Sequence, residues 1–235
     1  MNFSIIIPSY GQARYLREAI ESALAQTVKC EVIVVDDGST DGSLKIAEEY
    51  SDRLKVIKQV NKGLAAARNT GIMNAMGDWI LPLDADDILM VNCVERLIAL
   101  HTKYPDADVL APSFQTMGVV QEHITLMQEP KLEDFRTANR IGYFSAIRKT
   151  ALLEIGGYSP RMVWGAEDYA LWFDLLTRGK KIVTTPEILV LYRTKEESMW
   201  IETQKHTKEF MQQIYKDYPS AWPKELQEEL KNKQI

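Results

Sequence analysis

The sequence contains little cysteine and little histidine. Its two cysteines, Cys30 and Cys93, lie far apart, and the three histidines, His101, His123 and His206, share no metal-ligand spacing. Two distant thiols are typical of buried residues in a reducing compartment and do not make a disulfide framework. Histidines scattered in this way argue against a zinc enzyme.

Long hydrophobic runs and basic stripes are also missing. No segment approaches the roughly 20 apolar residues that a membrane helix needs, and residues 1–4 lack the start of a signal peptide. Lys and Arg total 28 against 33 Asp and Glu, which gives a net charge of −5 and argues against nucleic acid as a partner. We therefore expect a cytoplasmic protein. Peripheral association with the inner face of the membrane and the oligomeric state are left open.

Three widespread sequence motifs are absent as well. No Gly-x-Gly-x-x-Gly follows the first predicted strand, and neither Gly-Lys-Ser/Thr nor Gly-x-Ser-x-Gly occurs. These absences argue against a dinucleotide-dependent oxidoreductase, a P-loop phosphohydrolase and a serine hydrolase, respectively.

What the sequence does contain is an alternation of strand and helix patterns. Residues 3–8 and 30–35 are short, β-branched runs typical of strands buried on both faces, and residues 13–26 between them carry apolar side chains at helical spacing. The alternation continues with helices predicted at 43–50, 63–75 and 90–103 and strands at 54–57, 79–83 and 108–110. The pattern predicts a doubly wound α/β fold, a Rossmann-like, mostly parallel sheet with helices on both faces, whose ligand cleft lies beyond the carboxyl ends of the strands.

The alternation breaks after residue 111. Short β-like runs follow at 113–118 and 120–126, and later segments predict strands at 143–147 and 188–192, helices at 150–154 and 167–177, and polar helices after Trp200 and Trp222. The length of 235 residues suits one α/β domain. We divide this single domain into a nucleotide-binding half (1–111), an acceptor-binding and catalytic half (112–195) and a C-terminal helical extension (196–235).

The most informative segment is Leu83-Asp84-Ala85-Asp86-Asp87, which directly follows the predicted strand 79–83. Three carboxylates so close together repel one another and favour a cation. Asp84 and Asp86 can converge on Mg²⁺ or Mn²⁺, with the remaining positions left for diphosphate oxygens. The alternative is a polar turn in which Asp86 or Asp87 caps a helix that begins near Ile88.

Five ordered motifs carry a family resemblance. They are Ser-Ile-Ile-Ile-Pro-Ser-Tyr (4–10), Val-Val-Asp-Asp-Gly-Ser-Thr-Asp (34–41), Asn-Lys-Gly-Leu-Ala-Ala-Ala-Arg-Asn-Thr-Gly (61–71), Leu-Asp-Ala-Asp-Asp (83–87) and Gly-Ala-Glu-Asp (165–168). In this order they resemble the motifs of glycosyltransferase family 2, and five together are far more specific than one. The resemblance covers roughly residues 3–193. It implies the A-type glycosyltransferase fold, a nucleotide-diphosphate sugar donor, a divalent metal and inversion of the anomeric centre.

The resemblance assigns the nucleotide-binding residues. It gives Asp37 the contact with the base, and the Tyr10 ring can stack on a uracil-like base while Pro8 stiffens the strand end. Ordinary strand-end packing is the alternative for Pro8 and Tyr10. Arg68 is expected to reach the cleft as a fixed cation, the alternative being a solvated charge. We expect uridine diphosphate as the nucleotide, with guanosine or thymidine forms next.

The same resemblance gives Asp84 to the ribose and makes Asp86 the ligand of the Mn²⁺ or Mg²⁺ cofactor. A divalent ion there would stabilise the charge of the departing diphosphate. Asp87 can either share this role as metal ligand or cap the next helix, and we prefer the helix-capping interpretation.

Glu167 and Asp168 begin a predicted amphipathic helix, where a capping role is the alternative for either. The resemblance makes Asp168 the base that accepts the proton of the acceptor hydroxyl and places Glu167 in the substrate site. Trp164, with Trp172, can form an apolar wall against a sugar ring, although core packing is the alternative. Arg193 resembles a family position near the phosphates.

The resulting expectation is a metal-dependent, inverting transferase that moves a sugar from a UDP-sugar to a glycan, a lipid-linked or another hydroxyl acceptor, in cell-surface polysaccharide assembly. A catalytically silent nucleotide-sugar-binding regulatory or scaffold protein is the alternative, and acidic residues at both the metal and base positions favour the enzyme. A nucleotidyltransferase is disfavoured because residues 9–14 are a poor triphosphate-binding loop. The sequence does not decide the sugar or the acceptor.

Overall fold

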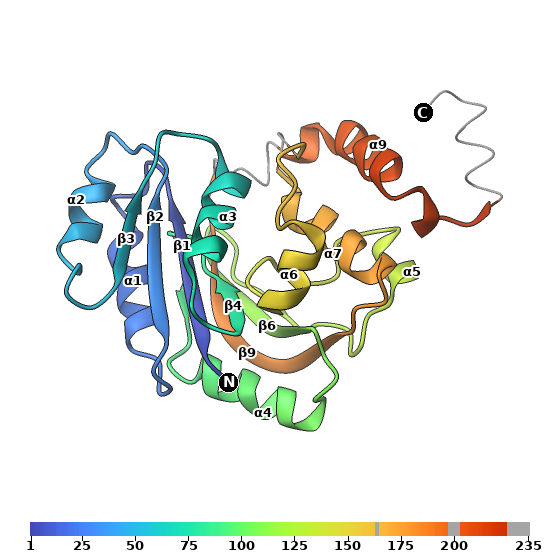
Figure 1. Ribbon diagram of the computed structural model, residues 1–235, viewed down its shortest axis with the longest axis horizontal. Helices are drawn as coiled ribbons and strands as arrows, with labels where there is room; N and C mark the ends of the chain where they lie inside the picture. Colours follow the sequence, from blue (N-terminus) through green and yellow to red (C-terminus); the bar gives the residue numbers. More distant parts are fainter. Residues whose placement is uncertain (163–164, 197–202, 225–235) are drawn as a thin grey trace.

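The computed structural model describes residues 1–162, 165–196 and 203–224. In these residues one mixed sheet lies between two layers of helices (Figure 1). The strands are β1 (Phe3–Ser9), β2 (Glu31–Asp36), β3 (Lys55–Lys58), β4 (Trp79–Pro82), β5 (Ile88–Leu89), β6 (Val109–Gly118), β7 (His123–Ile124), β8 (Ala146–Arg148) and β9 (Ile182–Thr194). The helices are α1 (Leu16–Leu24), α2 (Ser43–Glu48), α3 (Leu64–Asn74), α4 (Cys93–Lys103), α5 (Leu132–Phe135), α6 (Lys149–Ile155), α7 (Glu167–Thr177) and α9 (Thr207–Asp217), followed by a short 3₁₀ turn, η1 (Pro219–Ala221).

The first half of the sheet is parallel, with strand order β3-β2-β1-β4. β1, β2 and β4 are short and almost fully buried, as expected of apolar runs covered on both faces, whereas β3 at the edge of the sheet is partly exposed. The last residues of β1 and β2, Ser9 and Asp36, are register partners. The carboxyl ends of β1, β2 and β4 therefore meet at one edge of the sheet, where the predicted motifs begin.

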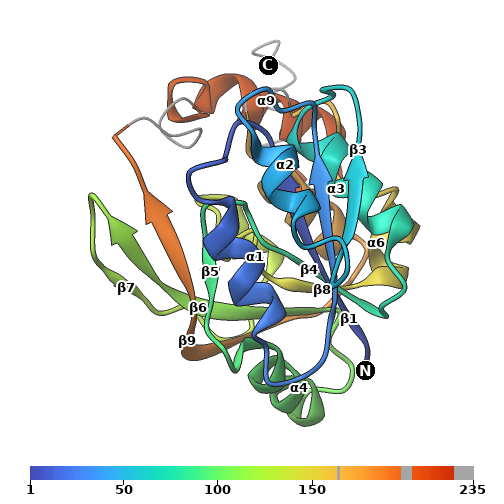
Figure 2. The same cartoon turned by 90° about the vertical axis from the view of Figure 1, so that its left-hand side faces the viewer.

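The second half of the sheet mixes strand directions. β8 pairs antiparallel with both β4 and β6, whereas β6 and β9 form a long parallel pair. β9 curves away along the sheet, and the β6–β7 hairpin extends beyond it (Figure 2). The expected α/β fold with helices on both faces is confirmed, with antiparallel pairing confined to this half.

Side chains that alternate along the strands form a hydrophobic core on each face of the sheet. Ile5 and Ile7 of β1 pack in one core with the apolar faces of α1, α2 and α4. Ile6, between them, packs in the other core with α3, α6, α7 and α9. Because successive side chains of a strand point to opposite faces, one apolar run supplies both cores.

One expected helix start is wrong, although the helix predicted at 90–103 forms as α4. The helix anticipated near Ile88 does not form there, because Ile88 and Leu89 pair antiparallel with Leu191 and Val190 of β9, and α4 begins at Cys93. A partner a hundred residues away overrides the local pattern. Within the described ranges, no helix combines the length and apolarity required to cross a membrane.

Candidate functional site

A cavity of about 370 Å³ lies at the carboxyl ends of the parallel strands. Six of the residues expected from the sequence line it: Pro8, Tyr10, Asp37, Asp84, Asp86 and Arg193. The Tyr10 side chain is 57% exposed, so its ring is free to stack on a planar ligand. The sheet edge thus gathers residues from β1, β2, the loop after β4 and the end of β9.

Asp37 organises the loop that precedes α3. Its Oδ1 accepts hydrogen bonds from Gln59 Nε2 at 2.6 Å and the Lys62 backbone N–H at 2.9 Å, and Oδ2 accepts the Gly63 backbone N–H at 2.8 Å. A carboxylate offers about four acceptor positions, so roughly one is left for a ligand donor. Gly63 has φ of +87°, a backbone conformation that favours glycine.

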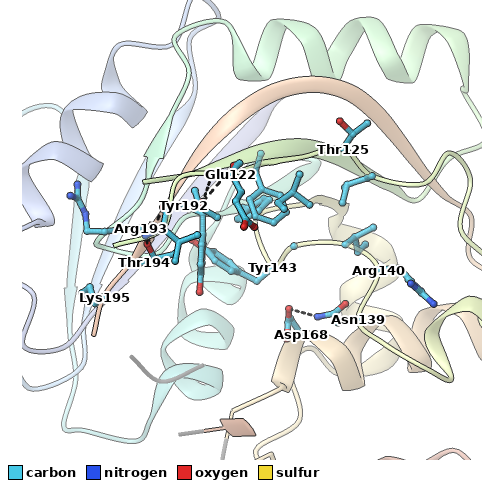
Figure 3. A pocket seen from close by; sticks show the side chains of 18 of the residues that line it. Glu122, Thr125, Asn139, Arg140, Tyr143, Asp168, Tyr192, Arg193, Thr194 and Lys195 are labelled. Carbon is cyan, nitrogen blue, oxygen red and sulfur yellow. Dashed lines mark hydrogen bonds between the residues drawn. The ribbon is translucent and has the colours of Figure 1, made fainter. Parts of the chain in front are cut away.

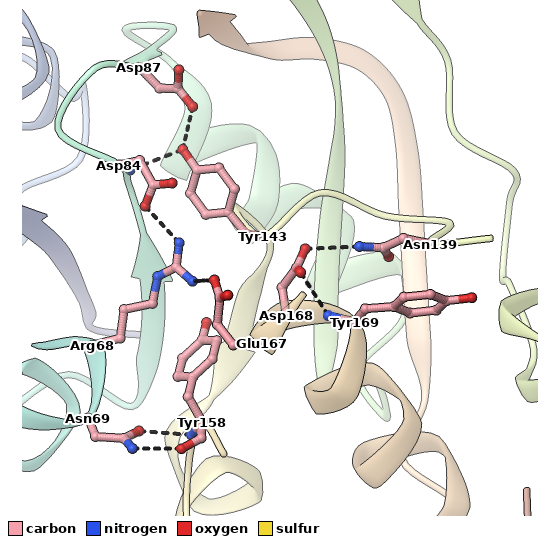
Figure 4. A network of polar contacts seen from close by, with 10 residues as sticks. All are labelled: Arg68, Asn69, Asp84, Asp87, Asn139, Tyr143, Tyr158, Glu167, Asp168 and Tyr169. Carbon is pink, nitrogen blue, oxygen red and sulfur yellow. Dashed lines mark hydrogen bonds and ion pairs between the residues drawn. The ribbon is translucent and has the colours of Figure 1, made fainter. Parts of the chain in front are cut away.

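Arg68 connects the two halves of the site (Figure 4). Its side chain is 1% exposed; Nη2 contacts Asp84 Oδ1 at 2.7 Å and Nη1 forms an ion pair with Glu167. The rings of Tyr143 and Tyr158 lie 4.8 and 5.2 Å from the guanidinium carbon. The two carboxylates and both rings stabilise this buried charge, and the pKa of Arg68 is raised well above its usual value despite the desolvation that opposes it.

The capping interpretation of Asp87 is wrong. Its carboxylate is buried and accepts hydrogen bonds from the Tyr143 hydroxyl and, at 2.7 Å, from the Arg193 backbone N–H. The Tyr143 hydroxyl also accepts the Asp84 backbone N–H at 3.0 Å. Burial raises the pKa of Asp87 well above its ordinary value. Asp87 therefore fixes the acidic loop against β9 and caps no helix.

Asp86 faces a cation from the end of β9. Lys195 Nζ lies 2.5 Å from Asp86 Oδ2, and Arg193 Nε donates to the Asp86 backbone oxygen at 2.8 Å. A second Arg193 nitrogen, Nη2, contacts Glu18 Oε2 at 2.6 Å. Together with Arg68, which contacts Asp84, Arg193 and Lys195 place three basic side chains around the loop that carries Asp84 and Asp86.

The carboxylates of this loop fit a divalent ion whose remaining coordination positions are filled by oxygens of a substrate. Among the residues that the structure describes, no group of three or more His, Cys, Asp or Glu side chains could hold a metal alone. Asp84 and Asp86 both line the cavity, and Mg²⁺ is commonly held by one or two carboxylates plus phosphate oxygens. The ammonium against Asp86 marks the spot as favourable to positive charge.

A second cavity, of about 810 Å³, adjoins the first (Figure 3). The two share Tyr192, Arg193 and Lys195 in their linings, and Asp168 lines only the larger one. Asp168 Oδ2 accepts a hydrogen bond from Asn139 Nδ2 at 2.9 Å.

The start of α7 aims two adjacent carboxylates in different directions. Gly165 and Ala166 both have positive φ, +92° and +59°, and for alanine this is a strained conformation. After this turn Glu167 points inward to Arg68, whereas Asp168 contacts Asn139 at the cavity (Figure 4). Desolvation, and secondarily the charge of Glu167, raises the pKa of Asp168 to about 7. A carboxyl with this pKa is half protonated at neutral pH and suited to accept a proton.

The remaining expected residues are placed differently. Arg68 and Glu167 line neither cavity and instead support Asp84 and α7, so their contact with substrate stays a prediction. Trp164 lies outside the described residues. Trp172 is fully buried in the core and is no wall of the site.

Three contributors were missed in the sequence: Tyr143, Asn139 and Lys195. Tyr143 looked like an ordinary strand residue, and Asn139 lies in a polar stretch without a pattern. Lys195 lies two residues after the expected Arg193, and this proximity was the one available signal.

A family model for "Glycosyl transferase family 2" matches residues 4–164. The chain belongs to glycosyl transferase family 2. An uncharacterized glycosyltransferase of Rickettsia typhi, RT0329, is 33% identical over 205 residues, which are 82% of this chain and 64% of that protein. The chain therefore spans just under two thirds of the length of this relative.

Two solved structures are similar to this chain in fold. S. aureus TarS 1–349 in complex with UDP has a TM-score of 0.72 at 23% identity, over 87% of this chain and 64% of that chain. The mannosyltransferase PcManGT from Pyrobaculum calidifontis, in complex with GDP-Man and Mn²⁺, has a TM-score of 0.69 at 17% identity, over 94% of this chain and 68% of that chain. At these identities the likeness concerns the fold, which is the expected A-type glycosyltransferase fold.

Proposed function

We propose that this family 2 chain transfers a sugar from a nucleotide-diphosphate donor, a UDP-sugar first of all, to an acceptor hydroxyl with inversion. The observation that carries the proposal is the pair of adjoining cavities, with Asp86 in one, Asp168 in the other and Tyr192, Arg193 and Lys195 common to both. An inverting displacement needs the leaving group and the base on opposite sides of the reacting carbon. Two cavities that meet provide such an arrangement.

The smaller cavity is assigned to the donor. Tyr10 offers a stacking surface and Asp37 an acceptor for a base or ribose donor, while Asp84 and Asp86 face the ribose and diphosphate. When bound at Asp86, Mn²⁺ or Mg²⁺ supplies Lewis-acid stabilisation of the departing diphosphate. UDP in TarS, and GDP-Man with Mn²⁺ in PcManGT, support a donor and a metal of these classes.

The larger cavity is assigned to the acceptor. Asp168 takes the proton of the acceptor hydroxyl as its oxygen bonds to the anomeric carbon, and the bond from that carbon to the β-phosphate oxygen breaks. The electron pair of the broken bond leaves with the nucleoside diphosphate. Asn139 holds the Asp168 carboxylate in place by its hydrogen bond. A role in cell-surface polysaccharide assembly rests on the family resemblance alone.

Calorimetric titration with UDP and Mn²⁺ tests the donor assignment. We expect UDP to bind in a Mn²⁺-dependent way, and Asp86→Asn to remove that dependence because the variant lacks the anionic ligand. Asp52→Asn, at an exposed turn outside both cavities, is the matched control and should bind as the parent does. UDP affinity that is unaffected by excess chelator, or by Asp86→Asn, would contradict the assignment.

A further inference from the structure

The larger cavity, which we assign to the acceptor, is lined largely by apolar side chains, whereas binding a sugar requires mainly hydrogen-bonding groups. Phe114, Ile124, Leu126, Ile141, Phe144 and Tyr192 lie along its wall. The aromatic rings pack on one another, with centroids 5.0 Å apart for Phe114 and Phe144 and 6.0 Å for Phe114 and Tyr192. These rings form a continuous apolar part of the cavity lining.

The charged side chains of this cavity other than Asp168 contact groups of the protein or are exposed to solvent. Arg193 and Lys195 contact Glu18 and Asp86, as described above. Arg140, at the opposite end in Figure 3, donates to the Asp134 backbone oxygen at 2.8 Å and the Thr137 hydroxyl at 2.7 Å. Glu122 and Glu196 are exposed to solvent.

Two of the polar side chains that line the cavity, Asp168 and Asn139, lie together and are hydrogen-bonded to each other. Figure 3 shows these two side chains together, across the cavity from Thr125. The volume, about 810 Å³ against about 370 Å³ on the donor side, is near the upper end of the roughly 300–1,000 Å³ range of small-molecule sites. A ligand with a hydroxyl group at one end and an apolar chain along the aromatic wall would complement this lining.

We infer that the acceptor is an amphiphile, a hydroxyl-bearing headgroup linked to an alkyl or prenyl chain, and that the chain lies along this aromatic wall. The inference rests on the proposed function for the position of the hydroxyl. It adds the class of acceptor: a lipid-linked molecule in preference to a free glycan. Val119 and Val120, exposed at the turn between β6 and β7, lie where the chain would leave the cavity.

Isothermal titration with hexyl and methyl β-D-glucopyranoside, in the presence of UDP and Mn²⁺ and below the micelle concentration, tests the inference. The two probes share a headgroup and differ by five methylene groups. Full burial of all five corresponds to about a thousandfold in affinity and burial of only two to about tenfold. We expect the hexyl compound to bind at least about tenfold more tightly.

Two variants, Val120→Asp and Val91→Asp, test where the alkyl chain of the hexyl glucoside binds. Val120 lines the cavity and is 42% exposed, whereas Val91, 55% exposed before α4, lines neither cavity, so both variants are expected to fold. Val120→Asp should reduce the hexyl advantage below about threefold, Val91→Asp should retain it, and UDP should bind both variants equally.

Equal affinities for the two glucosides in protein that binds UDP would overturn the inference and leave the proposed function standing. A hexyl advantage unchanged by Val120→Asp would overturn it too, because the chain would then lie elsewhere. Loss of UDP binding by the parent chain would instead contradict the donor assignment.

Discussion

The buried ion pair of Arg68 and Glu167 gives the sharpest stability prediction. Arg68 is 1% exposed and the Glu167 side chain 8%, so Arg68→Met leaves a carboxylate in a nearly dry environment. Removing one partner of a buried pair costs about 3–5 kcal/mol of unfolding free energy. At roughly 2–4 °C per kcal/mol for a chain of this size, we expect Tm to fall by about 6–20 °C.

A double-mutant cycle isolates the pair. Glu167→Gln alone leaves Arg68 with Asp84, whose side chain is 26% exposed, and should cost about 1–3 kcal/mol. In Arg68→Met/Glu167→Gln no charge remains buried at Glu167, so the double variant should be more stable than the sum of the two losses predicts, by about 2 kcal/mol or more.

Urea unfolding followed by circular dichroism measures the cycle. The matched control is the surface pair Arg96 and Glu187, whose Arg96 Nε and Glu187 Oε2 lie 2.6 Å apart with side chains 44% and 39% exposed. Its cycle, Arg96→Met with Glu187→Gln, should give a coupling of about 0–1 kcal/mol. Additive losses at Arg68 and Glu167, within about 0.5 kcal/mol, would refute the argument that the buried carboxylate depends on the guanidinium.

Three further predictions concern the site. Because Asp168 must be deprotonated to act as base, kcat/KM should rise with pH, with a midpoint at about pH 7. Glu167→Gln should lower the pH of this midpoint, because it removes a negative charge next to Asp168. A kcat/KM that does not change with pH would contradict this prediction. Lys195→Met should tighten Mn²⁺ binding about threefold to tenfold, because the Lys195 ammonium no longer pairs with the Asp86 carboxylate. Electron spin resonance measures the Mn²⁺ affinity, and unchanged or weaker binding would contradict the prediction. Ala166→Gly should raise the unfolding free energy by about 0.5–1 kcal/mol in urea unfolding, since glycine relieves the strained φ; a loss of stability would refute the strain.

The first half of the fold was predictable because its signals are local. Strand and helix alternate with short connections, and the predicted strand at 3–8 lies within one residue of β1. The carboxyl ends of neighbouring parallel strands must meet, so the gathering of Asp37, Asp84 and Asp86 at one cavity followed from topology.

The second half was less predictable because its pairings are distant. β5 exists only through β9, and β9 runs for thirteen residues where the sequence suggested five, since its pairing with β6 extends it past Pro186. The same distance conceals Tyr143 and Lys195, whose partners Asp87 and Asp86 lie far away in sequence. A residue's apolar or charged type does not disclose such a partner.

The apolar cavity was also invisible in the sequence. Its wall combines the β6–β7 hairpin, residues 139–144 and the end of β9, none of which carries a periodic pattern that predicts a shared surface. Only the folded chain brings Phe114 and Phe144 together beside Asp168.

Asp168→Asn, assayed for both binding and transfer, tests the central claim most directly. The change keeps the side chain's size and removes its basicity, so UDP and Mn²⁺ should bind within a few-fold of the parent. Release of UDP from a UDP-sugar, in the presence of a hexyl glycoside that the parent chain glycosylates, should fall by roughly 10² or more. A variant that binds UDP normally and transfers at the parental rate would contradict the account, because Asp168 would then only stabilise the start of α7.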